Sequence, residues 1–77
     1  MLNEYDVVTV VRIDQKDRPY TGTESACRPP QVGDVGTVVH IYDPGNATAP
    51  VVVEAVAPNG YTIWLADFFP YELKLKS

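Results

Sequence analysis

The chain has 77 residues, of which 45% are hydrophobic and 21% charged, and its formal net charge is −4. This length supports one domain, residues 1–77, and the composition is that of a folded chain rather than a disordered one. The acidic balance disfavours binding to nucleic acid, because such binding depends mainly on Lys and Arg side chains that neutralise phosphates.

Three features that the sequence lacks bear on the expected cellular location. The single cysteine, Cys27, cannot form an intrachain disulfide, and the start of the chain, Met1 to Glu4, lacks the basic and apolar segments of a secretion signal. No stretch reaches the roughly 20 apolar residues of a membrane span. We therefore expect a cytoplasmic protein that does not associate with membranes.

The first half of the chain predicts one strand, a long loop and a second strand. Residues 5–13 are rich in valine and apolar on both faces, which is typical of a strand that crosses a small barrel. Residues 14–31 show no periodicity and contain three prolines and a glycine, so they predict a long loop. The glycines at 33 and 36 predict a tight turn that leads into a curved strand over residues 35–42.

The second half predicts three more strands. Asp43-Pro44-Gly45-Asn46 is a turn signal, and a strand is expected over 51–56. Asn59-Gly60 predicts a hairpin that leads to a strand over 61–65. Residues 66–70 are too short for an α-helix and predict a single 3₁₀ turn, after which residues 71–75 alternate as a half-exposed last strand. The expected core is Val7, Val11, Ile13, Val39, Ile41, Val52, Ile63, Leu65 and Leu73.

Two short segments carry a resemblance to known families. Residues 31–39 (QVGDVGTVV) resemble the glycine turn of SH3-like barrels, including KOW-type domains, and residues 67–73 (DFFPYEL) resemble the 3₁₀ turn and last strand of that architecture. With the opening Asp6-Val7-Val8, the whole order resembles a bacterial family of small SH3-like proteins defined only as a domain of unknown function. The loop over 14–31 is longer than in that pattern.

The resemblance implies a fold and no activity. The expected class is all-β: a single small five-stranded SH3-like barrel with a long first loop and a short 3₁₀ turn before the last strand. KOW relatives imply binding to RNA or ribosomes, which the acidic charge of this chain disfavours.

The sequence contains no evident catalytic, metal or cofactor set. His40 is the only histidine and is expected to point away from Val39 and Ile41, into solvent. One histidine and the lone Cys27 make a poor metal site, and no carboxylate pair is spaced for acid–base work. We therefore expect no enzyme activity, no cofactor and no metal.

Aromatic residues offer the better lead, because eight of them exceed what so small a core needs. Tyr and Trp are enriched at binding hot spots, since they bury a large area and carry a polar tip. By analogy with SH3-like barrels, we expect a binding patch formed by Tyr20, Trp64, Phe68, Phe69 and Tyr71. The alternative interpretation places Trp64 and Phe68 in the core and leaves the tyrosines as ordinary rim residues.

Three functions follow as hypotheses. The first is a non-enzymatic protein-interaction module that binds a protein partner, or a second copy of itself, through the aromatic patch and the 14–31 loop. The second is a nucleic-acid-binding KOW-like barrel with Arg12, Arg18, Arg28, Lys74 and Lys76 as phosphate contacts. The third is an enzyme or accessory subunit whose active site is completed by another chain.

Overall fold

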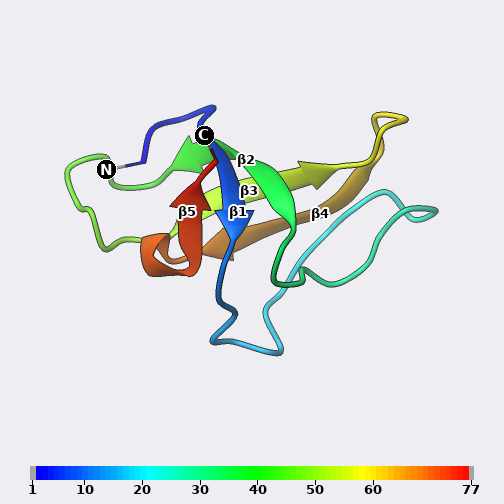
Figure 1. Cartoon of the computed structure of the whole chain (residues 1–77), viewed down its shortest axis with the longest axis horizontal. Coiled ribbons are helices and arrows are strands. Elements are labelled where there is room, and N and C mark those ends of the chain that lie inside the picture. The colour runs from blue at the N-terminus through cyan, green and yellow to red at the C-terminus, as the bar shows by residue number, and fades with distance from the viewer. Residues whose placement is uncertain (1, 77) are drawn as a thin grey trace.

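A computed structural model of the chain describes residues 2–76 and has five strands and one 3₁₀ turn (Figure 1). In chain order they are β1 (Val7–Val10), β2 (Val35–Ile41), β3 (Val51–Val56), β4 (Thr62–Phe68), η1 (Pro70–Glu72) and β5 (Leu73–Leu75).

All five strands belong to one antiparallel sheet with the order β4-β3-β2-β1-β5. β1 therefore lies between β2 and β5, and η1 leads the chain into β5, which pairs with β1 (Figure 1). This arrangement confirms the expected all-β SH3-like fold with a long first loop and a 3₁₀ turn before the last strand. Pairing between the outer strands β4 and β5 is absent from the part of the sheet described, so the barrel is open.

Several element boundaries differ from those expected. The first strand is shorter than 5–13, and β4 runs to Phe68, three residues beyond the expected end. The 3₁₀ turn lies at Pro70–Glu72 rather than within 66–70. Proline fits the first position of such a turn because its φ is preset and its missing N–H has no partner there to lose. The Glu72 carboxylate also accepts a hydrogen bond from the Phe69 N–H at 2.9 Å, which fixes the start of the turn.

The predicted core was in the wrong phase along most strands. Only Leu73 of the nine expected residues belongs to the buried core, although Ile13, Ile41 and Ile63 pack against it from partly buried positions. The residues that fill the core are Val8, Val10, Val38, Val51, Val53, Ala55, Trp64, Ala66, Phe68 and Leu73. Because successive side chains in a strand point to opposite faces, an error of one residue exchanges the two faces.

The turn before β2 agrees with the expectation from its glycines. Gly33 has a φ of 99°, a backbone conformation that residues with a side chain rarely adopt. Its N–H donates to the Val10 carbonyl at 2.8 Å. The Val10 N–H in turn donates to the Asp34 carbonyl at 2.8 Å. These two bonds close the end of the 14–31 loop onto the end of β1.

Candidate functional site

The 14–31 loop is attached to the outer edge of β4. Thr21 and Leu65 exchange two backbone hydrogen bonds of 3.1 and 2.7 Å, and the Thr23 N–H donates to the Thr62 carbonyl at 2.8 Å. A Cβ at Gly22 would lie 2.7 Å from the Ile63 carbonyl oxygen, so only glycine permits this close approach. The long loop is therefore a fixed part of the structure around Thr21.

One end of this loop is held by a buried ion pair. Arg18 Nη2 lies 2.8 Å from both carboxylate oxygens of Glu72, and the two side chains are 5% and 0% exposed. The Glu72 carboxylate also accepts from the N–H groups of Asp14, at 3.0 Å, and Phe69. The Arg18 guanidinium lies 4.2 Å from the centre of the Phe68 ring. We call this arrangement the Glu72 anchor.

The pKa of Glu72 reflects opposing effects. Burial is the largest single effect and raises the pKa, because it penalises the charged carboxylate. The Asp14 N–H, the Arg18 guanidinium and the Phe69 N–H together outweigh burial and hold the pKa of Glu72 below its usual value. Glu72 is therefore a carboxylate at neutral pH and acts as a structural group rather than as a proton donor.

The other end of the loop is held by Asp34. Its carboxylate forms a two-pronged ion pair with Arg28, with N–O distances of 2.8 and 2.9 Å, and accepts the Gln31 N–H at 2.9 Å. The indole N–H of the buried Trp64 donates to the same carboxylate at 2.8 Å. Burial raises the pKa of Asp34, but these donors outweigh it and the pKa is lowered. We call this arrangement the Asp34 anchor.

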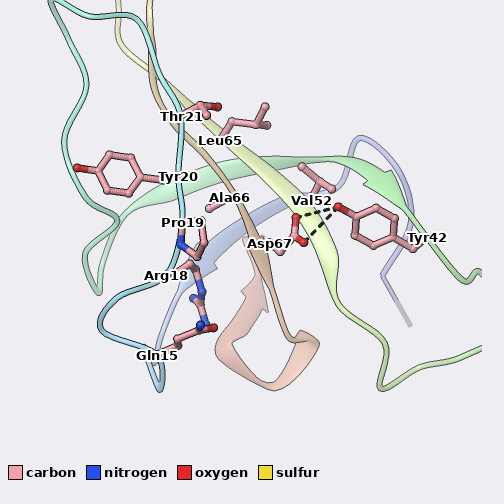
Figure 2. A pocket seen from close by; sticks show the side chains of 10 residues that line it. All are labelled: Gln15, Arg18, Pro19, Tyr20, Thr21, Tyr42, Val52, Leu65, Ala66 and Asp67. Carbon is pink, nitrogen blue, oxygen red and sulfur yellow. Dashed lines mark hydrogen bonds between the residues drawn. The ribbon is translucent and has the colours of Figure 1, made fainter.

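Between the anchored loop and the outer face of β3 and β4 lies a groove of about 410 Å³ (Figure 2). Pro19, Tyr20 and Thr21 form its loop side. The rest of the groove is lined by Gln15, Arg18, Tyr42, Val52, Leu65, Ala66 and Asp67. We call this hollow the loop groove, and its lining is mainly apolar.

Two smaller hollows extend the loop groove. One, of about 280 Å³, shares Gln15, Arg18 and Tyr20 with it and reaches Pro29 and Pro30. The other, of about 260 Å³, shares Thr21 and Leu65 with it and reaches Glu54 and Thr62. The three hollows therefore form a continuous concave surface along the loop, where the loop meets the sheet.

Tyr42 and Asp67 face each other across the outer side of the sheet (Figure 2). The Tyr42 hydroxyl donates to the Asp67 carboxylate, with O–O distances of 3.0 and 3.2 Å. This hydrogen bond is the main reason that the pKa of Tyr42 is raised, so its hydroxyl stays protonated. His40 is exposed, as expected, and its ring meets the Tyr42 ring edge-on at a centroid distance of 5.1 Å.

The five predicted patch residues do not form one surface. Trp64 and Phe68 are fully buried, with ring centroids 5.3 Å apart, so they cannot offer their faces to a partner. Phe69 and Tyr71 stack on each other at η1, with centroids 5.6 Å apart. Only Tyr20 borders the loop groove, and its ring points away from Tyr42 (Figure 2).

The sequence analysis missed the groove residues on the sheet, Tyr42, Val52, Leu65 and Asp67. Val52 and Leu65 were assigned to the core, whereas they are half-buried on the outer face. The signal was present in Asp67, which lies two residues after Leu65. A charged residue in that position marks the outward phase of β4.

Three of the five cationic residues named for nucleic-acid binding already form ion pairs with carboxylates of the chain. Arg18 and Arg28 belong to the two anchors, and the third, Arg12, pairs with Asp14 at 2.6 Å. Lys74 and Lys76 remain exposed on or beside β5. Positive charge available for phosphates is therefore much smaller than the sequence suggests.

Within residues 2–76, no group of three or more His, Cys, Asp or Glu side chains is placed to hold a metal ion. The same range contains no helix with the length and apolarity needed to cross a membrane. No protein-family model, curated protein or solved structure matches the chain.

Proposed function

We propose that this chain is a non-enzymatic protein-interaction module that binds its partner through the loop groove. The observation that carries the proposal is a concave surface with a mainly apolar lining, bordered by Tyr20 and Tyr42 and built on a loop that is anchored at both ends. A rigid surface loses little conformational entropy on binding, and half-exposed tyrosines supply large contact area.

The proposal keeps the 14–31 loop as a binding element and replaces the expected aromatic patch by the groove beside it. A groove of this size accommodates a few side chains of an extended segment rather than a whole folded domain. Binding of a second copy of the chain remains one form of the same proposal.

The test is affinity capture from lysate of the source cell, with and without nuclease, using wild type and three tyrosine variants. Tyr20→Ala and Tyr42→Ala each remove a border of the groove. Tyr61→Ala is the matched control, since Tyr61 is 48% exposed, similar to Tyr42 at 54%, and lies outside the groove lining. Circular dichroism of each variant checks that it is folded.

We expect one protein at near-stoichiometric yield that survives nuclease, is lost with both groove variants and is retained by Tyr61→Ala. Light scattering of the pure chain detects self-association and applies the same three variants to it. Capture that disappears with nuclease would favour the nucleic-acid hypothesis, and capture unaffected by both groove variants would refute the role of the groove.

A further inference from the structure

The solvent side of the loop groove carries uncompensated negative charge. Asp67 lies in the groove and Glu54 in the adjoining hollow, both on the outer face of the sheet. In the described part of the chain, neither carboxylate has a Lys or Arg within ion-pair distance. Arg18 also lines the groove, but the buried Glu72 carboxylate already balances its charge.

The pairing of Asp67 with Tyr42 suits a cationic side chain. The Asp67 carboxylate is exposed and uses one hydrogen bond donor, the Tyr42 hydroxyl, so it can still accept from an ammonium or guanidinium group. The neighbouring Tyr42 ring offers a face over which a cation is attracted. Val52 on β3 pairs with Asp67 on β4 and with His40 on β2, two residues before Tyr42, and it gives the aliphatic stem of such a side chain an apolar surface.

Arg18, which lines the same groove, has a hydrogen-bond donor that is not used. Arg28 engages its carboxylate with both terminal nitrogens, whereas Arg18 uses Nη2 alone. Among residues 2–76, Arg18 Nη1 is a buried side-chain nitrogen with no hydrogen-bond partner, and in the view of Figure 2 the Gln15 side chain overlaps the end of the Arg18 side chain; both residues line the groove. A buried donor without an acceptor is costly, and because Glu72 already supplies the negative charge, a neutral oxygen is sufficient here.

We propose that the loop groove receives an extended segment of a partner protein that carries a Lys or Arg side chain. The cation pairs with Asp67 against Tyr42, and a backbone carbonyl of the segment accepts from Arg18 Nη1 after the Gln15 side chain turns aside. This inference rests on the proposed function and specifies the chemistry of its partner. A polyamine would supply the cation but no carbonyl, and a nucleic acid would bring phosphates to a negative surface.

The test is selection of random nine-residue peptides, displayed on phage, against the immobilised full-length chain. The same selection uses Asp67→Asn and, as the matched control, Asp43→Asn. Asp43 is an exposed carboxylate outside the groove lining, so both variants change the net charge equally. The best peptide is then titrated into each protein, and the guanidinium NMR signal of Arg18 is followed.

We expect wild type and Asp43→Asn to select peptides enriched in Lys or Arg, and Asp67→Asn to lose this enrichment. The affinity of the best peptide falls roughly fivefold with Asp67→Asn and stays unchanged with Asp43→Asn. The Arg18 signal shifts on binding, and spermine at the same concentration leaves it in place.

The inference fails if wild type selects no peptides, if those selected lack cations, or if Asp67→Asn binds them as tightly as wild type. The proposed function is judged separately by the captured partner. If Tyr42→Ala abolishes capture while Asp67→Asn leaves it intact, the groove binds a protein but the partner is not basic at this position.

Discussion

The Glu72 and Asp34 anchors hold opposite ends of one loop with the same chemistry, an arginine on a carboxylate supported by backbone N–H groups. They differ in their access to water. Arg18 and Glu72 are almost completely enclosed, whereas the side chains of Arg28 and Asp34 are 40% and 13% exposed. Because the chemistry is the same, a difference in stability between the two ion pairs can be attributed to burial.

In the Glu72 anchor, the Arg18 and Glu72 side chains are shielded from water, so each charge is stabilised mainly by the other. An enclosed charge that loses its partner has no water to replace it, so breaking a buried pair is far more costly than its net contribution suggests. At the Asp34 anchor, Arg28 is open to water, and the Asp34 carboxylate also holds the Trp64 indole and the Gln31 N–H. We expect the two anchors to respond differently to the same kind of substitution.

The largest expected effect is that of Arg18→Met. The substitution leaves the Glu72 carboxylate buried without its cation, which should cost about 3–5 kcal/mol of unfolding free energy. A domain of this size has roughly 4–12 kcal/mol in total, so much of the stability would be lost. Urea unfolding followed by circular dichroism measures the change. The double variant Arg18→Met, Glu72→Met should recover part of the loss, and a double variant as unstable as Arg18→Met would contradict the explanation by unpaired charge.

The next effect is a loss of stability in acid. The pKa values of Glu72 and Asp34 are both lowered in the folded chain, so the unfolded chain binds protons more readily. The stabilisation is fully present above the unfolded carboxyl pKa values of about 4 and is lost as the pH falls through the lower folded values. Urea unfolding between pH 7 and pH 2.5 should show this decrease. Glu72→Gln should flatten the profile, and an unchanged slope would show that Glu72 does not carry it.

The smallest effect is expected at the Asp34 anchor, which is more exposed to water than the Glu72 anchor. Asp34→Asn should cost about 1 kcal/mol, because water hydrates the released Arg28 and the amide still accepts from the indole. The indole N–H signal of Trp64 in NMR should shift, which reports the altered hydrogen bond directly. Arg12→Gln, at the most exposed of the three ion pairs, is the control and should leave the midpoint of unfolding unchanged. If Asp34→Asn proved as damaging as Arg18→Met, burial would not explain the difference between the anchors.

The order of the elements could be read from turn and strand signals along the chain, but the face of each strand could not be read from valines that occupy both phases. The charged residues contain the missing information. Glu54 shares its phase with Val52, and Asp67 shares its phase with Leu65, so these pairs face outward. In β2 the register shifts between Val38 and His40, and no simple alternation predicts that.

The site was harder to predict than the fold because its parts come together only through distant pairs. Arg18 and Glu72 are 54 residues apart, and Tyr42 and Asp67 are 25 apart. Absence of periodicity correctly indicated a loop over residues 14–31, but it carried no information on where that loop is attached. Aromatic excess pointed to binding without distinguishing rings that the core requires, such as Trp64, from rings that border a groove.

The attachment of the loop at Thr21 also has a consequence for self-assembly. An uncovered strand at the border of a sheet is a template for pairing with other chains, and β4 carries the apolar sequence Ile63-Trp64-Leu65 at such a border. The loop occupies the hydrogen-bonding groups of this stretch and so acts as a built-in guard against fibre formation. Because each anchor depends on an ionised carboxylate whose pKa is lowered in the folded chain, acid that protonates Glu72 and Asp34 should weaken the attachment of this guard.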